Sequence, residues 1–114
     1  MKIRLDKADQ TFSKYIRKRD GRCCRCGSIN GLQASHYFGR GKESTRFDPE
    51  NVDSLCFGCH QYWGSTNREE YRNFKIKQLG QRGFDLLCLR AETYCKKDRH
   101  LSYLYAKKLL EELD

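Results

Sequence analysis

The sequence has very little proline, no internal repeat and no long apolar run. Its 114 residues include one proline, Pro49, and no Pro-, Gly- or Ser-rich stretch of the kind that links independent domains. A chain of this length has room for one compact domain, so we expect a single unit. No apolar segment approaches the roughly 20 residues that a membrane-spanning helix requires, and this absence argues against a membrane protein.

A secretory signal peptide is also missing from the sequence, because charged residues occur throughout positions 1–20. We therefore expect a cytoplasmic protein, in which thiols stay reduced. Seven cysteines in so short a chain could form a disulfide framework or bind metal. An odd number of cysteines in a reducing compartment favours metal binding.

Positive charge is in excess. The chain has 23 Lys and Arg against 15 Asp and Glu, a formal net charge of +8. This surplus attracts polyanions such as nucleic acid, because each neutralised phosphate releases counterions; solubility alone is the other explanation. With 38% hydrophobic and 33% charged residues, the domain needs a staple beyond its small core.

Helical periodicity begins near the start of the chain. A helix is predicted from about residue 6 to residue 19, with Asp6 as its cap. Its apolar stripe consists of Leu5, Ala8, Phe12, Tyr15 and Ile16. The following region, residues 21–52, is rich in glycine, and its short apolar stretches 32–34 and 36–38 could be the strands of a small hairpin.

The second half of the chain is predicted to be helical. Helices are expected at 67–79 and 84–94, and Asp98 can cap a last helix. Cys88 and Cys95 fall in this part and are interpreted as ordinary buried cysteines. The last helix has an apolar stripe that could be core or a partner-helix face, made of Leu101, Leu104, Tyr105, Leu109 and Leu113.

Two Cys-x-x-Cys pairs provide the missing staple. Cys23 and Cys26 form the first pair, and Cys56 and Cys59 form the second. Paired knuckles of this kind are typical of a structural zinc ion held by four thiolates, which supplies folding energy directly. Cys24 is an alternative ligand to Cys23, although the spacing to Cys26 favours Cys23.

Three polar residues occur in a non-random order around the knuckles. His36 lies between the two pairs, Asn51 precedes the second pair, and His60 directly follows Cys59. Because a zinc-fixed frame carries all three, we expect them to converge in space.

This layout resembles the HNH, or His-Me finger, nucleases. The phrasing His36-Tyr37, Arg46-Phe47-Asp48 and Asn51-Val52 ahead of Cys56-x-x-Cys59 is similar to the phage NinG/Rap recombination protein family. The resemblance covers roughly residues 5–87. It implies an α+β fold, in which a small ββα-metal core stapled by the four-cysteine zinc site is flanked by an N-terminal helix and several C-terminal helices.

The resemblance also implies a role for each site residue. His36 is expected to be the general base that activates water, and His60 a ligand of a catalytic Mg²⁺ or Mn²⁺ ion. Asn51 would either orient the His36 loop or complete the metal shell. Arg40 and Arg46 would clamp the scissile phosphate through their planar guanidinium groups.

One position departs from the family pattern. Many HNH enzymes have Asp or His directly before the general base as a second metal ligand, whereas this sequence has Ser35. The missing carboxylate could come from Asp48, Glu50 or Asp53, or DNA and water could hold most of the ion. The serine also keeps an alternative open, a zinc-dependent nucleic-acid-binding module without catalysis.

The expected protein is therefore a single-domain, metal-dependent DNA endonuclease. Residues 1–20 would form the N-terminal helix, residues 21–66 the zinc and ββα core, and residues 67–114 the helical remainder. The resemblance suggests branched or junction DNA as the substrate, in a bacterial host cytoplasm if the protein is phage-encoded. The stripe between Leu101 and Leu113 is a candidate surface for a homodimer.

Overall fold

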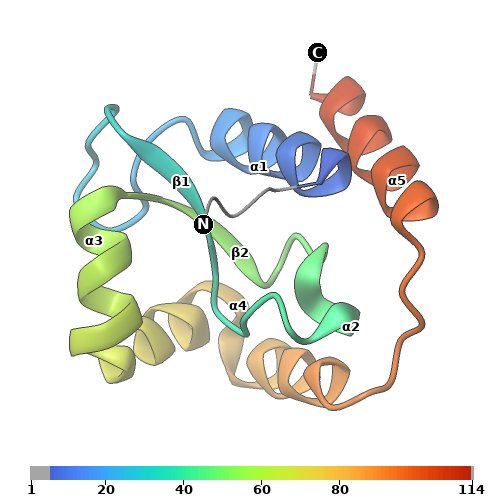
Figure 1. The fold of residues 1–114 in the computed structure, drawn as a ribbon. Helices are drawn as coiled ribbons and strands as arrows, with labels where there is room; N and C mark the ends of the chain where they lie inside the picture. Colours follow the sequence, from blue (N-terminus) through green and yellow to red (C-terminus); the bar gives the residue numbers. More distant parts are fainter. Residues whose placement is uncertain (1–5, 114) are drawn as a thin grey trace.

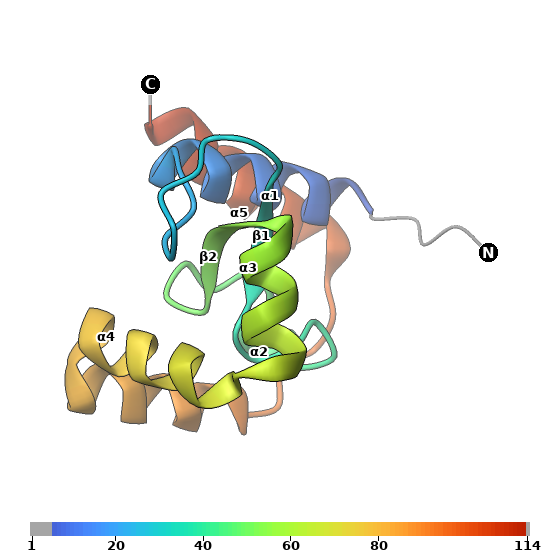
Figure 2. The same ribbon diagram turned by 90° about the vertical axis from the view of Figure 1, so that its left-hand side faces the viewer.

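A two-stranded antiparallel sheet lies between two helical layers in the computed structural model, which describes residues 6–113. Helices α1 and α5 cover one side of the sheet and α4 covers the other (Figures 1 and 2). The elements in chain order are α1 (Lys7–Asp20), β1 (Leu32–His36), α2 (Glu43–Arg46), β2 (Val52–Cys56), α3 (Phe57–Gln61), the π-helical turn η1 (Tyr62–Thr66), α4 (Arg68–Ala91) and α5 (Arg99–Glu112). The expected mixture of helices and a small sheet is thus confirmed.

Helix α1 forms as its sequence predicts. The Asp6 side chain accepts a hydrogen bond from the backbone N–H of Asp9 at 2.8 Å, which satisfies one of the free donors at the helix start. Gly21 ends the helix in the left-handed conformation, with φ at 69°. The predicted stripe is buried at Ala8, Phe12, Tyr15 and Ile16; Leu5 lies outside the described residues.

The predicted hairpin between residues 32–34 and 36–38 is wrong. Residues 32–36 form one strand, β1, and its partner is β2, with Ser35 opposite Asp53 and His36 opposite Val52. Strand β2 is buried on both faces from Val52 to Leu55, so it lacks the polar–apolar alternation that identifies a half-exposed strand. Of its two central polar residues, Asp53 is satisfied inside the protein by Lys75 and Gln78, whereas the buried hydroxyl of Ser54 has no hydrogen-bond partner among residues 6–113.

Helix α4 is bent at Gly80, where φ is 77° and ψ is 161°. The two predicted helices therefore exist as two segments of one element. The Asn67 side chain caps the first segment by accepting a hydrogen bond from the backbone N–H of Glu70 at 3.0 Å. The second segment ends at Ala91, three residues earlier than predicted. As a consequence Cys95 lies outside any helix and is exposed, which corrects its interpretation as a buried cysteine.

Helix α5 begins as predicted, with Asp98 accepting from the backbone N–H of Leu101 at 3.0 Å. Its packing excludes the core interpretation for most of the predicted stripe and leaves the partner-face interpretation as a prediction. Ala106 is buried, and Leu109 and Leu110 pack with it in the cluster that includes residues of α1. Most of the predicted stripe is exposed instead, with Leu101 61% and Leu104 45% accessible.

Aromatic packing fixes α4 against the sheet. Trp63 stacks on Tyr71 with ring centroids 4.7 Å apart, and Tyr37 meets Tyr71 edge-on at 5.1 Å. Leu55 of β2 and Phe84 of α4 belong to the same buried cluster. Within residues 6–113, no helix combines the length and apolar character needed to cross a bilayer.

Candidate metal centre and cleft

Four sulfur atoms form a cluster at one end of the sheet. Cys23 and Cys26 lie on the loop after α1, Cys56 ends β2 and Cys59 is in α3. Their four Sγ atoms lie within 4.8 Å of one another, and the Sγ atoms of Cys26 and Cys56 are 3.7 Å apart. A tetrahedral zinc ion with Zn–S bonds of about 2.3 Å requires sulfur separations of about 3.8 Å. The predicted ligand set therefore fits structural zinc.

Hydrogen-bond donors surround these sulfurs. The backbone N–H of Cys26 donates to Cys23 Sγ at 3.4 Å, and the Arg25 guanidinium donates to Cys59 Sγ at 3.5 Å. Burial opposes ionisation of Cys23, but backbone N–H groups of Cys26, Cys56 and Arg25 outweigh it and lower the pKa of this thiol to about 6. Such donors stabilise the negative charge of a four-thiolate site.

Cys24 is excluded from this cluster. Its thiol donates to the Asp20 carboxylate at 3.4 Å. Burial, together with the nearby charges of Asp20 and Asp53, raises the pKa of Cys24 to about 12. Of the two alternatives that the sequence left open, the ligand is therefore Cys23.

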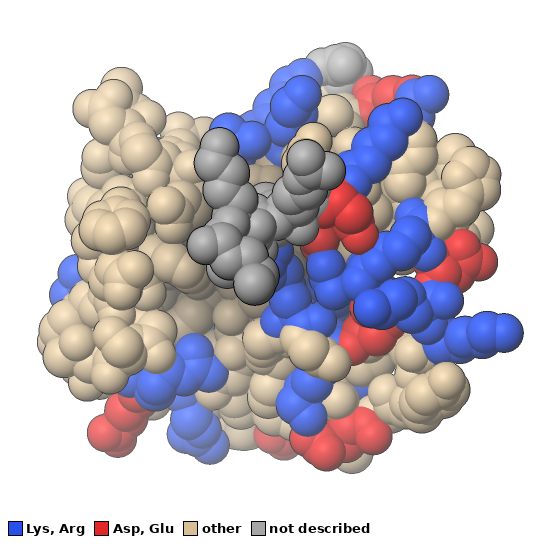
Figure 3. Space-filling view, in the orientation of Figure 1, with Lys and Arg blue, Asp and Glu red and all other residues tan. Residues whose placement is uncertain are grey.

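A cleft of about 520 Å³ opens beside the sulfur cluster. Helix α1 forms one wall, and β1, the loop after it and α3 form the rest. Its polar lining consists of Asp9, Ser13, Arg17, Gln33, His36, Arg40 and His60. On the face of the molecule seen in Figure 3, Lys and Arg gather towards the centre and right, whereas the surface over α3 at the left carries few charges.

His36 ends β1 and lies at the floor of the cleft. Its Nε2 atom is 2.9 Å from the backbone carbonyl oxygen of Arg46. Because a carbonyl oxygen only accepts, Nε2 carries the proton and Nδ1 is left as the acceptor. Burial lowers the pKa of His36 to about 4, and the charge of Arg40 acts in the same direction. The ring is therefore neutral at pH 7.

His60 projects into the same cleft from α3. Its Nδ1 atom is buried and has no hydrogen-bond partner among residues 6–113. Burial, with the charge of Arg40, lowers the pKa of this imidazole. A buried ring nitrogen without a partner is a costly feature, and a bound ion or ligand would satisfy it.

The two predicted phosphate-binding arginines differ in their surroundings. Arg46 donates to both carboxylate oxygens of Asp9, through Nε at 2.9 Å and through Nη2, and Glu43 lies 3.9 Å from it. Its guanidinium is thus already engaged. Arg40 is exposed at the mouth of the cleft, and its charge lowers the pKa of Asp9 and of both cleft histidines. Arg40 therefore lines the open cleft, whereas the guanidinium group of Arg46 does not.

Asn51 is completely buried and lies directly before β2, at the end of the loop that follows β1. Its side-chain oxygen accepts from the backbone N–H of Phe38 at 2.9 Å, and its amide donates to the carbonyls of Phe38 and Thr45 at 3.0 and 2.9 Å. Asn51 therefore fastens the loop that connects β1 to β2. This placement corresponds to the loop-orienting alternative, and a role in the reaction stays a prediction.

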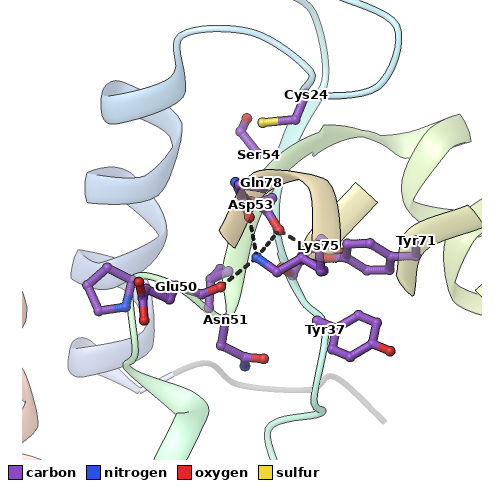
Figure 4. A network of polar contacts seen from close by, with 12 residues as sticks. Cys24, Tyr37, Glu50, Asn51, Asp53, Ser54, Tyr71, Lys75 and Gln78 are labelled. Carbon is purple, nitrogen blue, oxygen red and sulfur yellow. Dashed lines mark hydrogen bonds and ion pairs between the residues drawn. The ribbon is translucent and has the colours of Figure 1, made fainter. Parts of the chain in front are cut away.

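Ser35 points away from the cleft, because successive side chains alternate across a strand. Its hydroxyl lies 3.2 Å from the hydroxyl of Tyr71. Tyr71 belongs to a buried network on the α4 side, in which Figure 4 labels Asp53, Lys75 and Gln78. In that network Lys75 Nζ lies 3.0 Å from Asp53 Oδ2, and Gln78 donates to Asp53 Oδ1 at 2.9 Å. Ser35 is thus a structural residue here.

The three carboxylates considered as replacements for the missing ligand all lie elsewhere, so that alternative is wrong; the other alternative, an ion held mostly by DNA and water, stays a prediction. Asp53 is paired with Lys75 on the opposite side of the sheet. Asp48 and Glu50 bind Arg90 at 2.8 and 2.7 Å. Long-range ion pairs of this kind leave no signal in the local sequence. The carboxylate that does line the cleft is Asp9 of α1.

Sequence reasoning also missed the α1 wall of the cleft. Asp9, Ser13 and Arg17 are spaced four residues apart, so they form one polar stripe beside the buried stripe of the same helix. The spacing is visible in the sequence, but basic residues in the last turn of a helix are also expected from the helix dipole alone, so their presence does not by itself indicate a binding site.

These observations define a small mixed helix-and-sheet domain with a four-cysteine metal centre next to a cationic cleft. The chain belongs to the family described as Bacteriophage Lambda NinG protein, which it matches over residues 2–104. It is also 38% identical over 69 residues to the Probable ubiquitin carboxyl-terminal hydrolase 8 of Schizosaccharomyces pombe, an alignment that covers 58% of this chain. The chain spans 15% of the length of that relative. No solved structure matches the chain.

Proposed function

We propose that this protein is a metal-dependent DNA endonuclease of the HNH type. The observation that carries the proposal is the cleft itself, in which His36, His60 and Arg40 line one cavity beside the four-cysteine centre. A strand, a loop, a second strand and a helix carry these residues, which is the order of a ββα-metal unit.

His36 is the proposed general base. Its Nδ1 can accept a proton from an attacking water while the Nε2–H bond to the Arg46 carbonyl holds the ring in place. Because burial keeps the pKa of His36 low, the neutral form predominates at pH 7. A positioned base of this kind typically contributes about 10²- to 10⁴-fold to the rate.

A bound Mg²⁺ or Mn²⁺ would stabilise charge on the phosphate and on the departing oxygen. The buried Nδ1 of His60, which lacks a partner in the described part of the chain, fits a ligand of such an ion. The lining carboxylate Asp9 is occupied by Arg46, so substrate oxygens and water would supply most of the remaining ligands. We therefore expect weak binding of the divalent ion before DNA is present. Arg40 would bind the phosphate.

Branched DNA is the proposed substrate. The NinG family is a phage recombination-related family, and recombination produces branched intermediates. The net charge of +8 supports binding to nucleic acid. A cytoplasmic location, as expected from the sequence, agrees with such a substrate.

Two copies could act together on a two-fold branched substrate, since symmetric sites are commonly met by symmetric dimers. The exposed residues Leu101, Leu104 and Tyr105 on α5 offer a surface for the pairing. Light scattering at working concentration tests this, and a monomer under those conditions would remove the dimer from the proposal.

The decisive assay compares wild type, His36→Ala, His60→Ala and His100→Ala on supercoiled and four-way-branched DNA with Mg²⁺ or Mn²⁺. His100 is an exposed histidine on α5 and serves as the matched control. We expect His100→Ala to cut like wild type, and His36→Ala to bind DNA without cutting it. His60→Ala should require more metal for the activity that it retains.

A non-catalytic nucleic-acid-binding module is the second candidate. Its support is the shortage of metal donors in the cleft, where the lining carboxylate Asp9 is paired with Arg46. This candidate predicts that wild type and His36→Ala bind branched DNA equally and that neither cuts it with either metal. Cutting by wild type that His36→Ala abolishes would exclude the module.

A further inference from the structure

The α1 wall of the cleft carries a cation that the proposed chemistry leaves unused. Arg17 lines the cavity together with Asp9 and Ser13, on one face of α1. The negative charge of Asp9 on this wall is already neutralised by Arg46. Arg17 and Arg40 therefore give the cleft a net positive lining from two different elements.

The Arg17 guanidinium is held in place and still has donors to offer. Its Nε donates to the backbone carbonyl and to the hydroxyl of Ser13, both at 3.2 Å. Among residues 6–113 no carboxylate pairs with Arg17, and its two Nη groups have no protein acceptor. Two residues further along the helix, Arg19 contrasts with it, since Asp20 and two backbone carbonyls occupy its guanidinium. A guanidinium group that is held through Nε and has both Nη groups available as donors is suited to bind a phosphate group.

The distance along the helix indicates which phosphate this would be. Asp9 marks the His36 end of the cleft, because its partner Arg46 holds His36 through the main chain. Arg17 lies eight residues further on, roughly 12 Å along the helix axis at a rise of about 1.5 Å per residue. Each nucleotide of one strand of B-form DNA rises about 3.4 Å along the duplex axis but also winds around it, so neighbouring phosphates are roughly 7 Å apart and every second phosphate is roughly 13 Å away. The two ends of the wall are thus separated by about two nucleotides.

We propose that Arg17 binds a DNA backbone phosphate about two nucleotides from the bond that is cut. Helix α1 would then provide a second, non-catalytic contact that positions the DNA strand on the ββα unit. This inference rests on the proposed use of the cleft. It adds the spacing along the DNA strand between the phosphate bound by Arg17 and the bond cut beside His36.

The first experiment measures DNA affinity as a function of salt for Arg17→Gln, Arg17→Lys and Lys77→Gln. Lys77 lies in a separate cleft, between α4 and the end of α1, so its variant is the matched loss of one charge elsewhere. We expect Arg17→Gln to weaken binding about five- to tenfold and to reduce the slope of log K against log salt by about 1. Arg17→Lys should retain the slope, and Lys77→Gln should behave like wild type. An effect confined to Lys77→Gln would overturn the inference.

The second experiment locates the contact. A series of duplexes carries one uncharged methylphosphonate linkage at successive positions on either side of the cut. For wild type, we expect one neutral linkage about two nucleotides from the cut to weaken binding as much as Arg17→Gln does. Arg17→Gln should be insensitive to that linkage while still responding to the others. Equal sensitivity of the two proteins at every position would overturn the inference.

The outcomes separate this inference from the proposed function. If wild type cuts DNA and Arg17→Gln equals it in affinity and salt slope, the Arg17 contact is wrong and the nuclease stands. If wild type binds DNA without cutting, the methylphosphonate series is read around the protected region instead. If wild type does not bind DNA, both the Arg17 contact and the nuclease are rejected. Circular dichroism and zinc content establish that each variant is folded.

Discussion

Replacing Lys75 by methionine tests whether the buried ion pair holds α4 onto the sheet. Lys75 and Asp53 are both inaccessible to solvent, with their charged atoms 3.0 Å apart. Lys75 also donates to Gln78 at 2.7 Å and to the backbone carbonyl of Glu50. Methionine keeps the length of the apolar side chain, so the substitution removes mainly the charge and its hydrogen bonds.

The expected loss in the free energy of unfolding follows from the buried carboxylate that remains when Lys75 is replaced. Without Lys75, the Asp53 carboxylate stays buried, and its donors in the described part of the chain are Gln78 and Tyr71. Removing one partner of a buried pair typically costs about 3–5 kcal/mol, because the other charge is left without compensation. At roughly 4 °C per kcal/mol for a domain of this size, the Tm should fall by roughly 12–20 °C. The double variant Asp53→Asn, Lys75→Met should lose less than the sum of the single variants, by at least about 1 kcal/mol.

Urea unfolding followed by circular dichroism, with zinc content measured in parallel, provides the free energies of unfolding. Gln81→Met on the exposed side of α4 is a control for the change to methionine. A stability of Lys75→Met within about 1 kcal/mol of wild type would refute the reasoning, since Asp53 would then tolerate burial without its cation. Additive effects in the double variant would refute the coupling between the two residues.

Two further predictions concern the metal centre and the cleft. Cys56→Ser should lose zinc and its cooperative unfolding transition, whereas Cys24→Ser, which removes a thiol outside the cluster, should keep both in metal analysis and thermal melts. His36→Asn should remove a pH dependence: the pKa of His36 is about 4 when folded against 6.5 when unfolded, so between these values only the unfolded chain takes up the proton. Wild-type stability should therefore fall by about 3 kcal/mol relative to His36→Asn from pH 6.5 to pH 4, with no further difference below; parallel pH profiles of the two proteins would contradict the burial of this ring.

Features that depend on residues close together in the sequence were predictable. The α1 stripe, the Asp98 cap and the four-cysteine cluster each depend on residues at short, regular spacing. Periodicity and Cys-x-x-Cys spacing therefore identified them without knowledge of the fold. The placement of both cleft histidines on one zinc-fixed frame followed from the same spacing.

Features that depend on distant partners were not predictable. Strand β2 has no alternating pattern because helices cover both of its faces, and the polar side chain of Asp53 is satisfied by Lys75 in α4. The pairing of Asp9 with Arg46 joins residues 37 positions apart. Neither residue signals the other in the sequence, so the arginine was assigned to phosphate and the aspartate was overlooked.

Neighbouring side chains of β1 face opposite sides of the sheet, so one position contributes to stability and the next to the proposed chemistry. Ser35 faces the buried network of Tyr71, Asp53 and Lys75, whereas His36 faces the cleft. A carboxylate at position 35 would lie beside Asp53 in the network and add a second buried negative charge to a single lysine. The serine is therefore explained by the packing of α4 against the sheet. Its presence instead of a metal ligand is consequently no evidence that the cleft has lost its activity, and only the cleavage assay with His36→Ala distinguishes nuclease from binding module.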